Sequence, residues 1–327
     1  MASSEAARGG APHPGPLPQE EGVGSHGLLG PGRAGMLSIL IVNWNTRELL
    51  RACLRALAAH PYRGEAETIV VDNGSADGSA MLVEHEFPEV RLISNTANRG
   101  YAVATNQALA ASRGEWLLLL NSDTEVQDGA LDHLVACLGR HPAAGAAAGH
   151  LLNPDGTLQR SVRGYPEPWP MAAEALGLAR LFPRWPAVSA YRLRYWSHDT
   201  EREVEQPMSS ALLLRRAALG EVGLLDESFP PGGFYNDVDL CRRLDRAGWR
   251  VVYCPDAPVI HHLGASTGRL GWGKFRQSQA GLTRYYRKHY PGWRHFPKRA
   301  LVAALSWLSL APRAVRHAVR GERGSHI

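Results

Sequence analysis

The chain contains 327 residues, and 44% of them are hydrophobic, which is enough apolar material for one large α/β domain or two ordinary ones. No stretch reaches the roughly 18 uninterrupted apolar residues that a membrane span needs, and the N-terminus lacks the basic and then apolar order of a signal peptide. We therefore expect a globular, cytoplasmic protein. The formal net charge is +5, and beyond residue 280 ten lysines and arginines are opposed only by Glu322.

Residues 1–35 are dense in glycine, proline and alanine and contain few large apolar side chains. Burial of such a segment cannot offset the entropy lost when it becomes ordered, so we predict that it is disordered. Met36 directly precedes the first strand pattern, which raises the hypothesis that the natural start site lies there.

Strands and helices alternate from residue 37 onward. Short apolar runs predict buried strands, and apolar residues at spacings of three and four predict helices between them. The expected elements are a strand at 37–42, a helix with its N-cap at Asn45 or Thr46, a strand at 67–72, a helix over 77–87, a strand at 90–94, a helix over 102–112 and a strand at 115–120. This βαβαβαβ order predicts a parallel sheet with right-handed crossovers, and hence an α/β protein.

The second half of the chain is less regular. Residues 150–206 carry many prolines and tryptophans with little periodicity, which is typical of functional loops. Order returns with an apolar run at 211–216, a helix over 238–247 and strand-like runs at 250–254 and 257–262. The cysteines show no CxxC spacing and lie among apolar residues, so we expect reduced, packed thiols at Cys53, Cys137, Cys241 and Cys254.

Polar residues follow three of the predicted strands directly, at 43–45, 72–73 and 121–123. The carboxyl ends of parallel strands meet at one edge of a sheet, so these side chains should line a cleft that binds a nucleotide or holds a cation against phosphates. For Asp123 alone, a turn or the cap of a helix over 129–140 is the plainer interpretation. No GxGxxG follows the first strand and no GxxxxGK[ST] occurs, which argues against dinucleotide and P-loop sites.

Seven fragments stand in order along roughly residues 37–290. They are SILIVNWNTRELLRACLRAL, IVVDNGSADGS, NRGYAVATNQAL, WLLLLNSDT, LLNPDGTLQRS, FYNDVDLCRRLDRAGWRVVYCPDAPVIHHLGAST and RYYRKHY. Together they resemble the rhamnosyltransferase-type members of family 2 glycosyltransferases. The resemblance implies a GT-A fold, which is a Rossmann-like, mostly parallel central sheet flanked by helices. It also implies a nucleotide-sugar donor (a dTDP- or UDP-sugar), a divalent metal (Mn²⁺ or Mg²⁺) and inversion at the anomeric carbon.

The same resemblance assigns roles to individual residues. The donor-binding positions are Asn43, Asn45, Asp72, Asn98, Gly100, Asn106 and Asn121. Among them, Asp72 falls where the family hydrogen-bonds the pyrimidine base, and Gly100 would let the backbone approach the ligand closely. The metal-binding positions are Asp123, which is the last residue of the DxD-type motif, and His261. The general base corresponds to Asp237.

The chemistry of these residue types agrees with the assigned roles. A hard divalent ion held by one or two protein oxygens and by diphosphate oxygens stabilises a departing pyrophosphate, and Asp123 suits that geometry. A histidine ligand would favour Mn²⁺. Neighbours on a strand point to opposite faces, so only one of His261 and His262 can enter the site, and a structural histidine is the alternative for either.

Two acids lie at the start of the last predicted helix, where the helix dipole favours ionised side chains, and they cannot share a face. The family pattern assigns catalysis to Asp237 and leaves Asp239 to structure or acceptor binding, while capping by both is the alternative. The chain departs from that pattern at two positions. Asn236 replaces the usual glutamate before the base, which implies altered activity or acceptor choice, and Ser210 replaces a glycine.

A basic helical extension over 291–327 is expected after a catalytic domain over 36–290. Its segment ALVAALSWLSLAP, at 300–312, is too short to span a bilayer and is flanked by arginine and lysine. This pattern predicts a helix in the membrane interface, with packing on the core as the alternative. The basic end favours an anionic surface, whether lipid headgroups, a pyrophosphate or nucleic acid, and a solvated tail is the alternative. For the protein as a whole we expect no nucleic acid among its partners.

These observations predict an inverting, metal-dependent glycosyltransferase that acts in surface-glycan or cell-wall synthesis, with L-rhamnose as the first candidate sugar. Acceptors in the family are often polyprenyl-diphosphate-linked glycans, which would suit peripheral association with the inner face of the cell membrane. Two alternatives remain. A sugar nucleotidyltransferase would need a glycine- and lysine- or arginine-rich loop after the first strand, which is absent. A non-catalytic nucleotide-sugar-binding scaffold is suggested by Asn236.

Overall fold

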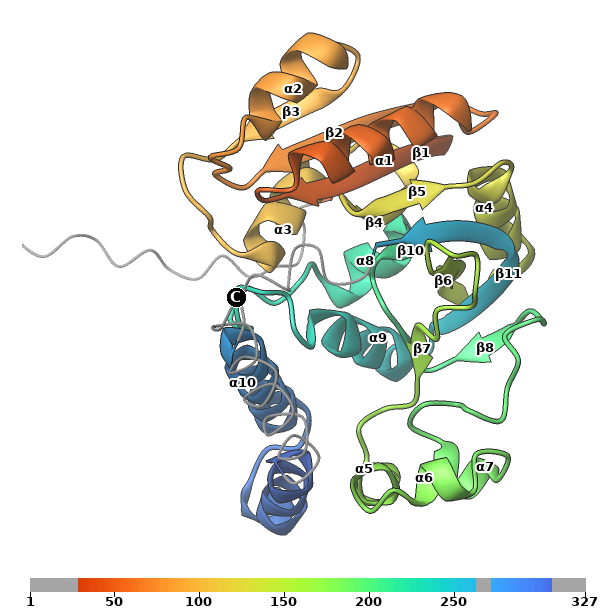
Figure 1. The fold of residues 1–327 in the computed structure, drawn as a ribbon, viewed down its shortest axis with the longest axis vertical. Coiled ribbons are helices and arrows are strands. Elements are labelled where there is room, and N and C mark those ends of the chain that lie inside the picture. Colours follow the sequence, from red (N-terminus) through yellow and green to blue (C-terminus); the bar gives the residue numbers. More distant parts are fainter. Residues whose placement is uncertain (1–28, 263–271, 308–327) are drawn as a thin grey trace, which may run out of the picture.

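The structure is a computed structural model that describes residues 29–262 and 272–307. Within these ranges the chain forms a nine-stranded mixed sheet with helices on both faces, and a smaller two-stranded sheet beside it (Figure 1). Six of the nine strands run in one direction, so the expectation of an α/β protein with a mostly parallel central sheet is confirmed.

The first half of the chain builds one side of this sheet as predicted. Its strands are β1 (Arg33–Asn43), β2 (Ala66–Asp72), β3 (Arg91–Ser94) and β4 (Gly114–Asn121), which pair in parallel in the order β3-β2-β1-β4. The connecting helices are α1 (Arg47–Ala59), α2 (Ser79–Glu86) and α3 (Tyr101–Ala111). The first strand starts three residues before the predicted boundary at residue 36, and Leu29 already packs against the core. Residues 1–28 lie outside the described ranges.

The second half completes the sheet with both strand directions. Its elements are β5 (Thr124–Val126), α4 (Ala130–Arg140), β6 (Ala144–Leu152), β8 (Arg202–Val204), β10 (Ala211–Arg215), α8 (Arg216–Val222), α9 (Asn236–Arg246) and β11 (Arg250–His261). The strand order continues β4-β10-β6-β11-β5, and β10 is antiparallel to both of its neighbours. The two strand-like runs predicted at 250–254 and 257–262 form one strand with an irregularity between Cys254 and Pro258.

The four leucines of β4 show why the sheet is stable. Leu117 and Leu119 belong to one hydrophobic cluster, with α3 and α9, and Leu118 and Leu120 belong to the cluster on the other face, with α1 and α4. Side chains alternate between the faces of a strand, so an uninterrupted leucine run is what a strand covered on both sides requires.

Two of the four cysteines are not free thiols. Cys137 on α4 forms a disulfide with Cys254 on β11, so the prediction of reduced thiols is wrong for this pair. The bond joins residues 117 positions apart, and spacing along the chain gives no sign that α4 packs on β11. Cys53 and Cys241 are free and buried, as predicted.

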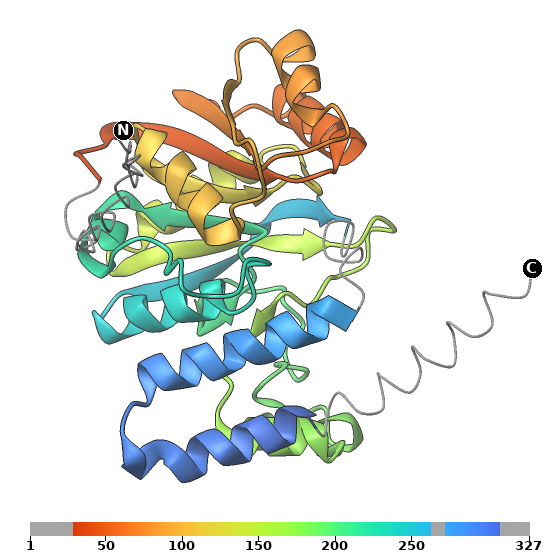
Figure 2. The same ribbon diagram turned by 90° about the vertical axis from the view of Figure 1, so that its left-hand side faces the viewer.

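Residues 150–206, expected as a long loop, contain short elements instead. These are β7 (Val162–Arg163), α5 (Pro168–Ala175), α6 (Leu178–Leu181) and α7 (Pro186–Ser189), and β7 pairs with β9 (Gln206–Pro207). Helix α10 (Trp272–His289) leads to a 3₁₀ turn (Trp293–His295) and a helical stretch at 296–307. Figure 2 shows α10 beneath the sheet and residues 296–307 beneath α10, level with α5 to α7.

The helical extension predicted at 291–327 is therefore present as far as residue 307, and the rest of it lies outside the described ranges. None of the helices in the described part of the chain is long and apolar enough to cross a membrane.

Candidate functional site

The carboxyl ends of β1 and β2 hold a closed polar cluster. Asn43 donates from Nδ2 to Asp72 Oδ1 at 3.0 Å, and the N–H of Ser75 donates to Asp72 Oδ2 at 3.0 Å. Asn43 and Asp72 are 0% and 3% exposed. Both oxygens of Asp72 are therefore already hydrogen-bonded within the protein, so this acid shapes the wall of the strand edge.

Asn45 and Thr46 tie this cluster to the neighbouring loops. Asn45 adopts a left-handed backbone conformation (φ 54°), which asparagine tolerates better than most residues, and its Oδ1 accepts the N–H of Ala76 at 2.8 Å. Thr46 occupies the N-cap of α1, one of the two predicted caps, but its hydroxyl donates to Asn43 Oδ1 at 2.6 Å instead of capping the helix. The same hydroxyl contacts Ser122 Oγ at 2.9 Å, which links this cluster to the end of β4.

Asn98 and Gly100 shape the loop that enters α3. Asn98 is exposed, and its Oδ1 accepts the N–H of Gly100 at 2.9 Å and Asn73 Nδ2 at 3.0 Å. Gly100 has φ +90°, and a Cβ there would lie 3.1 Å from Pro231. Both the left-handed backbone and the close approach of Pro231 therefore favour glycine at this position, and an approach of the backbone to a ligand stays a prediction.

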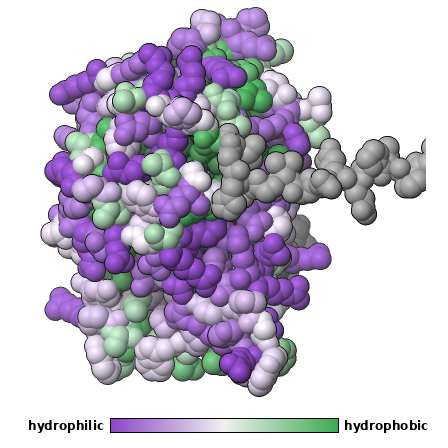
Figure 3. All heavy atoms as spheres, turned by 180° about the vertical axis from the view of Figure 1, so that it is seen from behind, coloured by the Kyte–Doolittle hydropathy of each residue, from purple (hydrophilic) through white to green (hydrophobic). Residues whose placement is uncertain are grey.

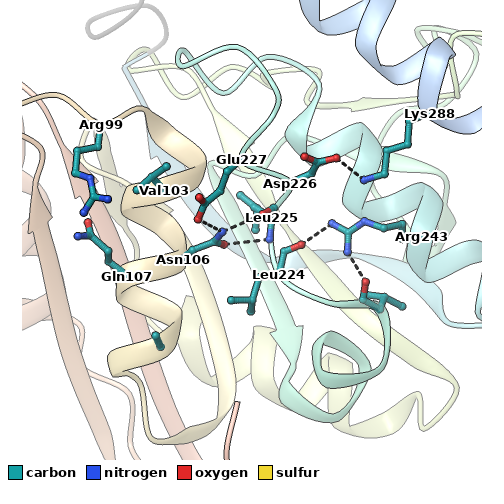
Figure 4. A pocket seen from close by; sticks show the side chains of 12 residues that line it. Arg99, Val103, Asn106, Gln107, Leu224, Leu225, Asp226, Glu227, Arg243 and Lys288 are labelled. Carbon is teal, nitrogen blue, oxygen red and sulfur yellow. Dashed lines mark hydrogen bonds and ion pairs between the residues drawn. The ribbon is translucent and has the colours of Figure 1, made fainter. Parts of the chain in front are cut away.

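Asn106 lies apart from the strand edge. Its Nδ2 donates to Leu225 O and to Glu227 Oε1, both at 2.9 Å, and its Oδ1 accepts the N–H of Leu225 at 3.1 Å. These bonds hold the loop after α8 against α3, in the wall of a cavity of about 590 Å³ that Arg99 and Lys288 also line (Figure 4). The donor-binding role of Asn106 stays a prediction. In the structure its amide is hydrogen-bonded to this loop, and none of the other predicted site residues lines the cavity.

A carboxylate and an imidazole face each other beyond the end of β4. Asp123 Oδ1 lies 3.4 Å from His261 Nε2, and the two residues are 4% and 2% exposed. His262 turns the other way and pairs with Glu125 Oε1 at 2.6 Å, so only one of the two histidines enters the site, as predicted. Asn121, the other predicted member of this motif, donates from Nδ2 to Ser210 Oγ at 3.1 Å.

Gln159 fixes the protonation of His261. Its Oε1 lies 2.6 Å from His261 Nδ1, while its Nε2 donates to Asn153 Oδ1 and to the His261 carbonyl at 3.0 and 3.1 Å. Both of those partners only accept, so the amide orientation is determined and Oε1 must receive the Nδ1–H. In the neutral ring the lone pair of His261 is therefore on Nε2, which faces Asp123.

This pair fits a divalent cation. The Asp123 carboxylate is almost fully buried, and among residues 29–262 and 272–307 the side chain paired with it is His261, at 3.4 Å. A buried carboxylate with a single, rather distant partner would be stabilised by a bound cation. Within the same ranges no cluster of three histidine, cysteine or acidic side chains could hold a metal. A cation bound by Asp123 and His261 would therefore complete its coordination with oxygens of a ligand or water.

Asp237 lies at the start of α9, next to a buried amide. It is partly exposed, and its Oδ1 accepts the N–H of Val238 at 2.9 Å. Desolvation raises the pKa of Asp237 to about 6, an effect that backbone hydrogen bonds and the charge of Arg163 reduce in part. Asn236, which is 1% exposed, has no hydrogen-bond partner for either polar atom of its amide.

Asp239 has a different environment, although it is only two residues away. It is 0% exposed and binds Arg243, Lys288 and His289 at 2.9, 2.8 and 2.8 Å. Burial alone would raise its pKa, but the hydrogen bond from His289 and the charges of Arg243 and Lys288 outweigh that effect and leave the pKa below its usual range. The expectation that the two acids occupy different faces is confirmed, and Asp239 ties α9 to α10.

Two consecutive serines connect the acid of α9 with the pair at β4 and β11. Ser210 Oγ contacts His261 Nε2 at 3.5 Å, and its carbonyl accepts the N–H of Asn121. The backbone of Ser209 lowers the pKa of Asp237, and its Oγ lies 3.3 Å from the hydroxyl of Tyr101. Adjacent Cα atoms are about 3.8 Å apart, so Asp237 and the Asp123–His261 pair lie on one side of the molecule.

Sequence reasoning did not single out Gln159 or Arg163, and it noted Ser210 only as a departure from the family. Gln159 stands inside the fragment LLNPDGTLQRS, where a polar residue following a turn was a usable signal. Arg163 is brought to Asp237 by the small sheet of β7 and β9, which no local pattern predicts.

Comparison with known proteins identifies the family and agrees with the fold. Residues 38–193 match the model of glycosyl transferase family 2. The chain is 32% identical over 275 residues to N-acetylglucosaminyl-diphospho-decaprenol L-rhamnosyltransferase of Mycobacterium tuberculosis, which covers 81% of this chain and 88% of that protein.

Solved structures share the fold at low sequence identity. A mannosyltransferase from Pyrobaculum calidifontis in complex with GDP-Man and Mn²⁺ superimposes with a TM-score of 0.55, at 18% identity, and covers 91% of this chain and 82% of that one. GalNAc-T7 with UDP, GalNAc and Mn²⁺ gives 0.53 at 14% identity, covering 83% of this chain and 54% of that one. The predicted GT-A architecture is thereby confirmed, and the chain belongs to glycosyltransferase family 2.

Proposed function

We propose that this glycosyltransferase moves a sugar from a nucleotide-sugar donor to a hydroxyl of a glycan or lipid-linked acceptor, with inversion and with a divalent metal. The observation that carries the proposal is the placement of Asp237 and the Asp123–His261 pair, joined through Ser209 and Ser210. L-rhamnose from a dTDP-linked donor is the first candidate, supported by the name of the Mycobacterium tuberculosis relative.

Asp237 would act as the general base. Its carboxylate takes the proton of the acceptor hydroxyl, the hydroxyl oxygen forms a bond to the anomeric carbon, and the bond from that carbon to the diphosphate breaks in the same displacement. A pKa of about 6 suits this role, because the group is ionised near neutral pH and still basic enough to hold the proton.

Asp123 and His261 would hold the divalent cation, and Gln159 would keep the imidazole oriented with Nε2 free. When bound, that cation neutralises negative charge on the departing nucleoside diphosphate. The closed cluster of Asn43, Asp72 and Ser75 would present a rigid wall to the base of the nucleotide, and Asn45 and Asn98 would keep the two flanking loops in place.

The acceptor is proposed to be linked to a polyprenyl diphosphate. The printed name of the relative describes an acceptor of that kind, and the basic C-terminal end of the chain is compatible with a membrane location. In this proposal the protein associates peripherally with the inner face of the cell membrane.

The test is release of nucleoside diphosphate from a panel of nucleotide sugars by the purified chain with Mn²⁺ and a simple alcohol or lipid-linked acceptor. We expect donor-specific release that Asp237→Asn abolishes, while Asp128→Asn, at a side chain that is 94% exposed, leaves it unchanged. Tight donor binding without turnover in the unmodified chain would instead support a scaffold, and release of pyrophosphate from a sugar phosphate and a nucleoside triphosphate would support a nucleotidyltransferase.

A further inference from the structure

Exposed apolar side chains gather at one end of the molecule. Nine of the ten large hydrophobic side chains that are at least half exposed in the described ranges lie in two segments, 169–185 and 293–307. They are Trp169, Leu176, Leu181, Phe182, Trp185, Trp293, Phe296, Leu301 and Trp307. The tenth, Met81, lies on α2 at the opposite end (Figure 1). Isolated exposed apolar residues are ordinary, whereas such a concentration marks an interaction surface.

The first segment contains a run in which every residue is exposed. This run is RLFPRWPA at 180–187, which joins α6 to α7. Leu181, Phe182 and Trp185 are 71%, 50% and 58% exposed, and they alternate with Arg180 and Arg184. The apolar side chains therefore do not fill the interior of the chain, and two of them, Leu181 and Trp185, directly follow an arginine.

The second segment packs on the protein with one face only. Val302 is fully buried in the core, and Ser306 Oγ accepts a hydrogen bond from Gln279 on α10 at 2.6 Å. Leu301 and Trp307 project from the remaining face, at 50% and 59% exposed, and Trp293 in the preceding turn is 81% exposed. Packing on the core, which was the alternative to a membrane-interface helix for this segment, thus explains one side of the helix. It gives no function to the exposed aromatic side.

An ion pair and two hydrogen bonds connect the parts of the chain that carry the two segments. Lys298 Nζ lies 2.6 Å from Glu167 Oε2, beside the first residue of α5, and the hydroxyls of Tyr286 and Tyr290 donate to Pro166 O and to Glu167. Figures 1 and 2 both place α5 to α7 and the helix of residues 296–307 at the lower end of the molecule. From behind, hydrophobic residues stand among pale ones along this same lower edge, below a largely hydrophilic surface (Figure 3).

The charge at this end is positive. The exposed or partly exposed cations of the two segments are Arg180, Arg184, Arg294, Lys298 and Arg299. Residues 291–307 contain no acid, and between 168 and 190 the only acid is Glu174, which is bound by Arg192 and Arg194. Aromatic side chains interleaved with arginine and lysine are the composition that binds at the headgroup level of an anionic bilayer.

We propose that these two segments form one membrane-binding surface, the aromatic surface, whose occupant is an anionic lipid bilayer. It consists of residues 180–187 together with Trp169, Leu176 and the exposed side chains of 293–307. The aromatic rings enter the interface between headgroups and acyl chains, and the arginines bind lipid phosphates. The proposed surface deepens the proposed function, because a polyprenyl-linked acceptor would be anchored in the same bilayer. The evidence for the surface is the exposure and the charge of its own residues.

The experiment is co-sedimentation of the full chain with vesicles of phosphatidylcholine alone or with about 30% phosphatidylglycerol, which gives the vesicles an anionic surface. We expect binding to the anionic vesicles that weakens as salt rises, and weak binding to the neutral ones. Two double variants, Phe182→Ser/Trp185→Ser and Trp293→Ser/Phe296→Ser, should each lower the affinity for anionic vesicles by about tenfold or more. The matched control is Met81→Ser, which removes a side chain of similar exposure from the opposite end and should bind normally.

Two results would overturn the proposal. One is failure of the unmodified chain to bind anionic vesicles, including the case in which the aromatic surface instead mediates self-association seen by light scattering. The other is equal binding by both double variants and the control. Vesicle binding needs neither donor nor acceptor, so absence of glycosyl transfer would disprove the proposed function and leave this result intact. Circular dichroism of each variant checks that these exposed substitutions leave the fold unchanged.

Discussion

The polar side chains at the two ends of the sheet edge differ in how far their hydrogen bonds are satisfied within the protein. At the ends of β1 and β2, Asn43 and Asp72 are hydrogen-bonded to each other and to Ser75. At the ends of β4 and β11 and the start of α9, Asp123 pairs with His261 at 3.4 Å, and Asn236 has no hydrogen-bond partner among the described residues. Buried polar groups are normally satisfied, so the difference separates groups that build the edge from groups that are available to a ligand.

The largest expected effect is on turnover. Asp237→Asn should lower kcat by about 10²- to 10⁴-fold, because the amide cannot take the acceptor proton while the nearly isosteric side chain keeps the geometry. Steady-state kinetics together with donor binding by calorimetry would show a loss in kcat with an unchanged donor Kd. A similar loss of donor affinity would move Asp237 from the acceptor side of the site to the donor side.

The next effect is on stability and concerns the neighbouring acid. Asp239→Asn removes a buried charge that pairs with Arg243, Lys288 and the imidazole of His289, so unfolding in urea should show a loss of about 3–5 kcal/mol. Asp245→Asn, at a side chain that is 41% exposed, is the control and should change stability by less than about 1 kcal/mol. Equal effects of the two variants would remove the distinction between a structural and an exposed acid on α9.

The lowered pKa of Asp239 also fixes the direction of a pH effect. A carboxyl whose folded-state pKa lies below its unfolded value contributes stability above the unfolded value, about 3.9, and loses it as pH falls through the folded value. The stability difference between the unmodified chain and Asp239→Asn should therefore be full at neutral pH and shrink below about pH 4. A difference that stays constant down to pH 3 would contradict this assignment.

Metal affinity should depend on Gln159. Gln159→Leu removes the acceptor that keeps the proton on His261 Nδ1, and we expect Mn²⁺ to bind about 10- to 100-fold more weakly. Gln159→Glu keeps an acceptor and should recover part of the affinity. Nitrogen chemical shifts of His261 in the metal-free protein report the tautomer directly, and an unchanged Nε2 lone pair in Gln159→Leu would rule out this role.

A smaller effect is expected in the pH dependence of the reaction. Because the pKa of Asp237 is raised to about 6, the base is protonated below that pH, and kcat/KM should fall about tenfold per pH unit there and level off above it. A pH–rate profile from 4.5 to 8 measures this limb. An inflection near pH 4 would mean that another group limits the rate.

The smallest expected effect is at Asn236. Its buried amide makes no hydrogen bond, so Asn236→Leu should leave the free energy of unfolding within about 1 kcal/mol or raise it. If glycosyl transfer by this variant falls at the same time, the amide of Asn236 binds a ligand. That result would strengthen the contrast with the hydrogen-bonded side chains at the ends of β1 and β2. A large loss of stability would instead show that the amide is bound by water.

Much of the fold followed from local patterns. The parallel order of β1 to β4 was predicted because each strand and helix in this part carries its own periodicity, and the two-sided burial of β4 is visible in its four leucines. The disulfide between Cys137 and Cys254 was not, because it joins segments far apart in the chain. The helices α5 to α7 were not either, because they are short and their stretch of sequence shows little periodicity. The same limit applies to Asn106, whose motif position gave no sign that it holds the loop at Leu225.

The sequence by itself determined the family, the first four strands and the identity of the acids at the strand ends, because these rest on residue order and on periodicities that act over a few residues. Only the tertiary structure decided which histidine faces Asp123, which of two acids pairs with two cations and a histidine, and which aromatic residues remain exposed. Those outcomes depend on burial and pairing among residues that can lie more than a hundred positions apart, such as Gln159 and His261, and no local pattern encodes them.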